Sequence, residues 1–350
     1  FCLECLEKSR LSCHDPNFKL YFYCRNKETY IMNKGIFTIS LDFELYWGMR
    51  DKVILDDYSN NLDGVELAIN EILKSFKKYN IHATWAVVGF LFFKNKKDLE
   101  DNLSSSLPSY RSQQYNPYKY IRENNELEQK YHFDSNSIKN IIDTDNQEIG
   151  THTLSHYYCL ELGQTRQEFF DDLTKAKEII KNKTNQETYS LVFPRNQFND
   201  EYLSVLKDLK ILSYRGNEKS WIYKAVNQED EQQVRRVIRL LDSYFNISGH
   251  NTHSLKELSY SQPYSIPSSR FLRPVSKKIC FAENLRLNRI KKSMTYAAKN
   301  NELFHLWWHP HNFGKDTFDN ISFLNKILEH YNVLQVKYGM KSLNMKEVSY

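Results

Sequence analysis

The stretch IFTISLDFEL, residues 36–45, alternates apolar and polar side chains, which predicts a β-strand. Residues 65–79 follow with apolar side chains at helical spacing, and residues 83–93 form a nearly continuous apolar run. Such a run is typical of a strand that is buried on both faces. Strand, helix and strand in this order predict a βαβ unit.

The same order of elements recurs further along the chain. A strand ends at Gly150, and Thr165 with Glu168 forms a capping box that predicts the start of another helix. Residues 303–308 form a further buried strand, and a helix is expected over residues 321–338. Strands that alternate with helices of this length predict an α/β fold with a parallel sheet, open or closed into a barrel.

The chain is expected to fold as a single domain over residues 32–350, with polar insertions near 94–130 and 216–275. The first insertion has the length of an inserted loop or lid. Residues 1–31 hold four of the six cysteines beside His14, but their spacing fits no usual zinc pattern. This segment lacks periodicity, and we expect it to be a disordered leader or a non-native extension.

The composition excludes several classes of protein. Hydrophobic residues make up 41% and charged residues 26% of the 350 residues, which is ordinary for a soluble globular protein. The net charge is only +5 and the basic residues are scattered, which argues against a nucleic-acid partner. No run reaches the roughly 18 apolar residues of a membrane span, and no secretory apolar region is visible. We therefore expect a cytoplasmic protein without a transmembrane segment, and the oligomeric state stays open.

Polar side chains collect where the predicted strands end. In parallel α/β folds and barrels, the carboxyl ends of the strands carry the active site. A random scatter of polar residues would not gather at these positions. The residues are Asp42 and Glu44 at the end of the first strand, His152 and His156 after another strand, Arg195 after Phe193-Pro194, and His309 and His311 after the last strand.

Two pairs among these residues have the chemistry of a metal site. Asp42 and Glu44 lie two residues apart on one strand face, so their carboxylates repel unless a proton or a cation lies between them. His152 and His156 are four residues apart and can face one ion, although roughly 0.3 such pairs are expected by chance among 11 histidines. Thr153 stands where a zinc protease of the H-E-x-x-H type has its glutamate, which excludes that class.

The ordered motifs resemble those of polysaccharide deacetylases, the NodB-homology superfamily of carbohydrate esterases, and in particular members found in surface-polysaccharide gene clusters. The resemblance extends over about residues 35–345 and implies a distorted (β/α) barrel with inserted loops and a divalent metal, commonly zinc. The motifs are Ser40-Leu41-Asp42-Phe43-Glu44, Ala83-Thr84-Trp85, Thr151-His152-Thr153-Leu154-Ser155-His156 and Leu306-Trp307-Trp308-His309-Pro310.

The resemblance also implies roles for individual residues. Asp42 matches the catalytic base and His309 the general acid, while Arg195 is near the arginine that holds the base. The implied metal ligands are Glu44, His152 and His156. Three departures from the family pattern leave alternatives open: Asp42 and Glu44 compete for the base, His309 and His311 compete for the acid, and Phe193-Pro194-Arg195-Asn196 is an incomplete match to the arginine motif.

The remaining candidates would contact the substrate. His311 is a substrate-binding candidate if it is not the acid, and a backbone N–H near Asn196 would stabilise an oxyanion. Of the two neighbouring tryptophans, Trp307 and Trp308, we expect one in the core and the other in a pocket wall, or both in the core. Trp308 is the one that we expect at the substrate.

The expected activity is metal-dependent removal of an N-acetyl group from an acetamido sugar in surface-polysaccharide metabolism. A metal held by two imidazoles and one carboxylate lowers the pKa of a bound water, from which Asp42 would take the proton while His309 protonates the leaving amine. Whether the sugar is part of a polymer or is linked to a lipid or a nucleotide stays open. The alternatives are a small-molecule amidohydrolase on the same scaffold and a carbohydrate-binding protein without catalysis.

Overall fold

Ten strands form one sheet in the computed structural model, which describes residues 34–104, 106–259 and 262–349. The predicted leader over residues 1–31 lies outside this part of the chain. The order along the sheet is β6-β9-β1-β2-β3-β4-β5-β7, with β10 paired to β1 and β8 paired to β9. The strands are β1 (Ile36–Phe43), β2 (Ala83–Val87), β3 (Gln147–Thr151), β4 (Ser190–Leu191), β5 (Ser213–Tyr214), β6 (His253–Ser254), β7 (Tyr264–Ser265), β8 (Arg270–Phe271), β9 (Glu302–Trp308) and β10 (Lys341–Ser342).

The pairings are parallel except for β6 with β9, so the predicted parallel α/β sheet is confirmed. The sheet curls, and the link from β7 to β8 joins its two sides: the Ser269 N–H donates to the His305 carbonyl 2.8 Å away, and the Ile266 carbonyl lies 3.2 Å from His305 Nδ1. The result is the distorted (β/α) barrel that the resemblance implied.

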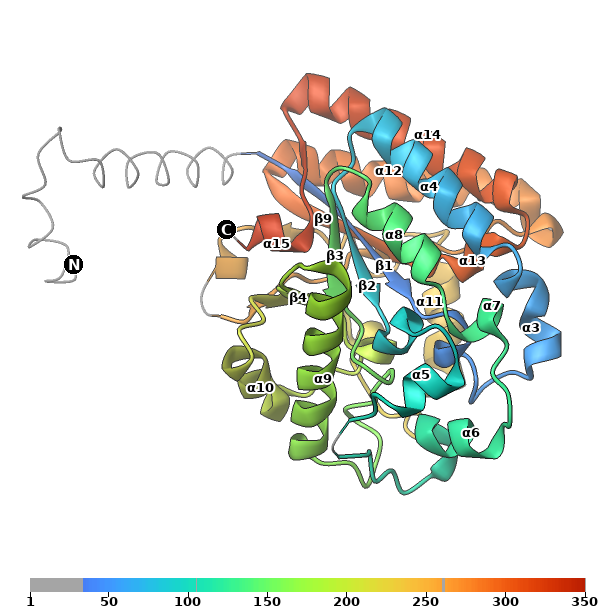
Figure 1. Cartoon of the computed structure of the whole chain (residues 1–350). Helices are drawn as coiled ribbons and strands as arrows, with labels where there is room; N and C mark the ends of the chain where they lie inside the picture. The colour runs from blue at the N-terminus through green and yellow to red at the C-terminus, as the bar shows by residue number, and fades with distance from the viewer. Residues whose placement is uncertain (1–33, 105, 260–261, 350) are drawn as a thin grey trace, which may run out of the picture.

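Helices cover the outer face of the curled sheet, with α4, α8, α12 and α14 on one side and α9 on the other (Figure 1). The Thr165–Glu168 capping box begins α9 as predicted. The helices are α3 (Leu55–Leu62), α4 (Val65–Tyr79), α5 (Lys96–Glu100), α6 (Pro117–Glu123), α7 (Gln129–His132), α8 (Ser135–Ile142), α9 (Arg166–Thr184), α10 (Leu203–Asp208), α11 (Gln233–Asp242), α12 (Glu283–Asn300), α13 (His311–Gly314), α14 (Thr317–Tyr338) and α15 (Met345–Val348).

The two faces of the central strand have different partners. Ile39, Leu41 and Phe43 of β1 join the large apolar core under the helices. Ser40 and Asp42 point to the concave side, where both are buried. The predicted alternation of residues 36–45 therefore holds in the strand, but its polar side faces the inside of the barrel rather than solvent.

The predicted strand over residues 83–93 is shorter in the structure. It ends at Val87, and a 3-10 helix, η3 (Gly89–Phe92), follows it. The N–H groups of Gly89 and Phe90 donate to Thr153 and Leu154, at 2.9 and 3.0 Å. A Cβ on Gly89 would lie 2.8 Å from the Leu154 side chain, so glycine permits this close approach to the loop that carries the histidine pair.

The two predicted insertions differ in structure. Residues 94–130 hold short helices, among them α5 and α6, whereas residues 216–275 hold α11 and supply β6, β7 and β8 to the sheet. Within the described residues, no helix is both long and apolar enough to span a membrane.

Candidate metal centre and active site

The candidate residues meet at the carboxyl edge of the sheet. Asp42 is the next-to-last residue of β1, and Glu44 is the first residue after the strand. His152 comes directly after β3, and His309 directly after β9. Because β9, β1, β2 and β3 are parallel and consecutive in the sheet, side chains that are far apart in the sequence come together there.

Glu44, His152 and His156 form a compact buried cluster. Glu44 Oε2 lies 2.9 Å from His156 Nε2 and 3.3 Å from His152 Nε2, and the three ligand atoms lie within 4.8 Å of one another. Burial raises the pKa of Glu44, but the charges of His309 and His156 and the imidazole hydrogen bonds outweigh it and hold the pKa well below its usual range. Burial lowers the pKa of His156 to about 4, which leaves a neutral imidazole near neutral pH.

The hydrogen bonds of this cluster fit a bound cation. His152 Nδ1 lies 2.8 Å from the Val192 carbonyl, which can only accept, so Nε2 carries the lone pair that faces Glu44. His152 Nε2 is buried without a hydrogen-bond partner among the described residues. Gly48 leaves room for the carboxylate, since a Cβ there would lie 2.1 Å from Glu44 Oε1. Two imidazoles and one carboxylate are a ligand set for zinc with open positions.

The loop between the two histidines is held by buried polar contacts. Thr153 and His156 adopt left-handed conformations, with φ of 65° and 58°, so the pair lies on an irregular loop rather than on a helix. The Asp172 carboxylate of α9 accepts hydrogen bonds from the Leu154 N–H at 2.7 Å and from Ser155 Oγ at 2.5 Å. Asp172 therefore positions the loop from behind.

The buried carboxyl group of Asp172 should make the free energy of unfolding depend on pH. Burial raises its pKa to about 7, above the ordinary value of 3.8. The native state therefore binds a proton that the unfolded state has released, and this contribution to stability is lost as pH rises from about 4 to about 7. Between about pH 5 and pH 7.5 we expect the wild type to lose about 2 kcal/mol more than Asp172→Asn, which stays neutral. Denaturant unfolding of both proteins at the two pH values measures this difference, and equal slopes would contradict it.

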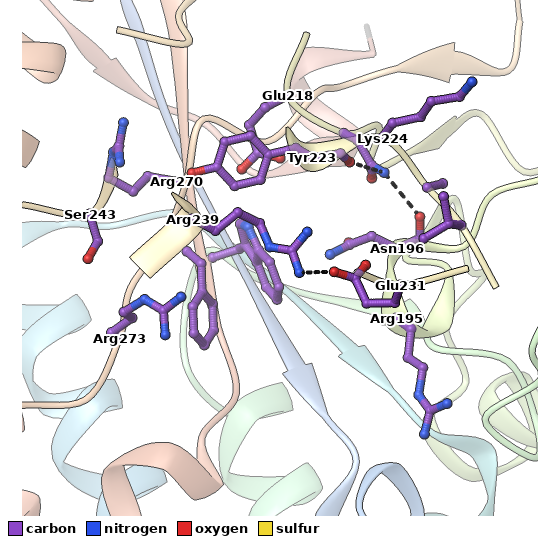
Figure 2. A pocket seen from close by; sticks show the side chains of 15 residues that line it. Arg195, Asn196, Glu218, Tyr223, Lys224, Glu231, Arg239, Ser243, Arg270 and Arg273 are labelled. Carbon is purple, nitrogen blue, oxygen red and sulfur yellow. Dashed lines mark hydrogen bonds and ion pairs between the residues drawn. The ribbon is translucent and has the colours of Figure 1, made fainter. Parts of the chain in front are cut away.

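The structure corrects the predicted partner of Asp42. Arg215, which directly follows β5, binds Asp42 through two hydrogen bonds, Nη1–Oδ1 at 2.6 Å and Nη2–Oδ2 at 2.7 Å. Arg195 instead forms an ion pair with Asp51, and its guanidinium points away from the other labelled side chains of the cavity (Figure 2). Burial raises the pKa of Asp42, but Arg215 with His152 and His309 outweighs it, so the pKa is lowered.

A polar network fixes the Arg215 guanidinium. Nη1 donates to Ser40 Oγ at 3.0 Å, and Ser40 Oγ lies 2.8 Å from His305 Nε2. The Asn196 side-chain oxygen accepts from Arg215 Nε and Nη2 at 3.1 and 2.8 Å. The backbone N–H of Asn196 itself donates to the Phe193 carbonyl at 2.9 Å and is not free for an oxyanion, so an oxyanion-binding N–H near Asn196 stays a prediction. Arg215, Ser40 and His305 were missed, although Arg215 obeys the same rule of lying directly after a strand.

The two candidate acids occupy different positions. His309 is partly exposed, lines the cavity, and places Nε2 3.7 Å from Asp42 Oδ2 and 3.6 Å from Glu44 Oε1. His311 is buried behind it, with the two rings stacked at 5.0 Å. Burial and the charge of His309 lower the pKa of His311 to about 3. Of the two imidazoles, His309 is therefore the one that faces the cavity, and His311 packs against it from the protein side.

Trp307, and not Trp308 as predicted, is the tryptophan that lies at the cavity. Trp308 is fully buried and packs against Phe76 and Phe313, at ring distances of 6.2 and 5.6 Å. Trp307 lines the cavity, and the Arg215 guanidinium lies 4.1 Å from its ring centre. Side chains alternate along β9, so the inner face carries His305 and Trp307, and Trp308 points to the helices.

A cavity of about 790 Å³ opens over these residues. Asp42, Glu44, His156 and His309 lie on one side of it. Residues of α11 and of the segment before that helix form the other side, which shares Arg239 and Arg273 with an adjoining pocket (Figure 2). The cavity therefore joins the candidate metal centre to a basic wall from the predicted insertion over residues 216–275.

Comparison with known proteins identifies relatives of the chain. Residues 56–213 match the polysaccharide deacetylase family model, a range that contains His152 and His156. The crystal structure of a candidate polysaccharide deacetylase from Mycobacterium smegmatis has the same fold, with a TM-score of 0.53 and 10% identity over 91% of this chain and 90% of that chain.

Two further solved structures share less of the fold. A CE4 family pseudoenzyme from Bacillus anthracis is 15% identical, with a TM-score of 0.41 over 91% of this chain and 66% of its own. A GH57-type branching enzyme from Pyrococcus horikoshii is 11% identical, with a TM-score of 0.48 over 89% and 69%. No curated protein matches the chain.

Proposed function

Since the chain belongs to the polysaccharide deacetylase (NodB-homology) superfamily, we propose that it removes an N-acetyl group from an acetamido sugar in surface-polysaccharide metabolism. As a member of that superfamily, it is a hydrolase of carbon–nitrogen bonds other than peptide bonds. The observation that carries the proposal is the cluster of Glu44, His152 and His156, which lies beside an arginine-bound Asp42 at the floor of an open cavity.

Glu44, His152 and His156 are the residues that would hold a divalent metal, and their donor set favours zinc. When bound, such a metal activates a water molecule and polarises the amide carbonyl. The imidazole of His152 is already oriented by the Val192 carbonyl, so little rearrangement of this ligand is needed.

The other residues would move protons and hold one another in place. Asp42 is the proposed base, because Arg215 keeps its carboxylate ionised and fixes its orientation next to the cluster. His309 is the proposed acid for the leaving amine, because its ring nitrogen lies within 4 Å of both carboxylates and faces the cavity. Ser40, His305 and Asn196 act on Asp42 only through Arg215, as positioning residues.

The proposal is tested by acetate release from a panel of N-acetylated sugars, with the metal content of the purified protein measured in parallel. We expect release from at least one neutral acetamido sugar, its loss with a chelator, and its recovery when zinc is added back. Binding of the sugars without any acetate release from metal-loaded protein would instead indicate a carbohydrate-binding protein.

A further inference from the structure

Helix α11 exposes its apolar face to solvent beside the cavity. Its inner side carries Arg235 and Asp242, both buried, and the partly buried Arg239. A surface helix of a globular protein normally does the opposite and packs its apolar stripe on the core. Six exposed large apolar side chains lie on α11 and the turn after it: Val234, Val237, Leu240, Leu241, Phe245 and Ile247.

Polar contacts fix this orientation. Arg235 Nη2 donates to the Lys224 carbonyl at 2.6 Å. Arg239 donates to the Ile222 carbonyl at 2.8 Å and to Glu231 at 2.6 Å. Asp242 is paired with Arg270 at 3.3 Å. These contacts give the buried arginines and the buried carboxylate their partners, and turning the apolar face inward would break each of them.

The exposed apolar face continues into the active-site cavity. Val237 and Leu240 are exposed on the helix and also line the cavity that contains Asp42 and His309. Trp221 adds to the same region, since it is 63% exposed and its carbonyl lies 3.4 Å from Arg235 Nη2. An apolar strip with a tryptophan and arginines beside it has the composition of an element that lies in a membrane surface.

The cavity wall next to this strip carries basic side chains that have only a long ion pair or none. The Arg273 side chain has no hydrogen bond or ion pair within the described part of the chain, and Arg273 and Arg239 line the same two pockets (Figure 2). Lys52 also lines the cavity without an ion pair there. Arg236 reaches Glu231 only at 4.0 Å, and that carboxylate is already bound to Arg239. Arg273 and Lys52 are thus without an ion pair among the described residues, and Arg236 has only a long one. Together they suit a phosphate or diphosphate with two or more charges better than a single carboxylate.

From these two features we infer that the substrate is an acetamido sugar joined through a phosphate or diphosphate to a membrane lipid, and that α11 docks on the membrane surface. The arginine-lined wall takes the phosphate, and Val237 with Leu240 receives the start of the apolar chain. This inference rests on the proposed deacetylase function for the sugar end of the substrate. It also accounts for an apolar face that is continuous with a charged cavity.

Membrane docking is tested by sedimentation of the full chain with vesicles of phosphatidylcholine and phosphatidylglycerol. We expect binding of the wild type, and at least about a fivefold smaller bound fraction for the double variant Leu241→Gln, Phe245→Gln, neither of which lines the cavity. Phe318→Gln on α14 is the matched control, because Phe318 is 69% exposed but lies on another helix, and it should bind like the wild type. Both variants should hydrolyse a soluble neutral acetamido sugar at the wild-type rate.

Phosphate recognition is tested with three substrates that share one acetamido sugar: the neutral sugar, its nucleoside diphosphate derivative, and its diphosphate ester with a long alkyl chain in vesicles. We expect Arg273→Gln to lower kcat/KM for both phosphate substrates at least about tenfold more than for the neutral sugar. The alkyl derivative should be the best substrate of the wild type. A preference for the nucleoside derivative would overturn the lipid assignment.

Two further outcomes would overturn the inference while leaving the deacetylase proposal intact. In the first, the wild type does not sediment with vesicles and instead forms a dimer that the Leu241→Gln, Phe245→Gln variant abolishes, so the apolar face joins two copies of the chain. In the second, Arg273→Gln lowers kcat/KM equally for all three substrates. Failure of the deacetylase proposal is recognised separately, because vesicle binding is measured without turnover.

Discussion

Replacing Arg215 with alanine is expected to reduce acetate release at least about a thousandfold and to lower the free energy of unfolding by about 3–5 kcal/mol. The variant leaves the Asp42 carboxylate buried without its two hydrogen bonds, so burial then raises the pKa of Asp42 and the proposed base becomes protonated. Steady-state kinetics with a neutral acetamido sugar and denaturant unfolding measure the two effects.

Two further variants separate the role of Arg215 from general destabilisation. Arg215→Lys keeps the charge but cannot form two parallel hydrogen bonds to Asp42, and we expect intermediate activity from it. Arg195→Gln removes the ion pair with Asp51 and should reduce stability, yet it should change kcat much less than Arg215→Ala does. If Arg195→Gln were as inactive as Arg215→Ala at equal stability, Arg215 would not be the group that holds the base.

Arg215 was missed for a physical reason that concerns the strand before it. β5 contains only Ser213 and Tyr214, too short for any periodic pattern to appear. The long central strands could be predicted, because β1 and β9 carry seven or eight residues each whose burial leaves a readable apolar pattern. Short strands toward the end of a curled sheet form because they pair with strands that are distant in the sequence. A local sequence pattern does not indicate such pairing.

The tryptophan pair shows how more could have been inferred from the sequence. Side chains on a strand alternate between its two faces, so a residue two positions before His309 shares its face and one position before does not. That rule places Trp307 with His309 at the cavity and Trp308 in the core, which is the arrangement in the structure. The Asn196 amide is a different case, because its hydrogen bond to Phe193 depends on two consecutive left-handed residues, Arg195 and Asn196, that no pattern indicated.

Replacing Glu44 or Asp42 by the corresponding amide is expected to show which carboxylate binds the metal and which acts as the base. Glu44→Gln should lose the metal, with an affinity at least about a hundredfold lower, because an amide is a poor replacement for a carboxylate ligand. Asp42→Asn should keep one metal per chain but lower kcat by about 10²–10⁴, the usual contribution of a general base. Metal content after dialysis and steady-state kinetics distinguish the two results.

Gly48→Ala completes this comparison because it retains each proposed ligand and the base. The new Cβ would lie 2.1 Å from Glu44 Oε1, and the end of that side chain can move away without a change in the backbone. We therefore expect weaker metal binding than in the wild type, a nearly unchanged unfolding midpoint, and activity that returns as zinc is raised. Asp42→Asn should show no such recovery, since the missing group there is the proton acceptor. If Asp42→Asn lost its metal while Glu44→Gln kept it, the two carboxylates would have the opposite roles, with Asp42 as the ligand.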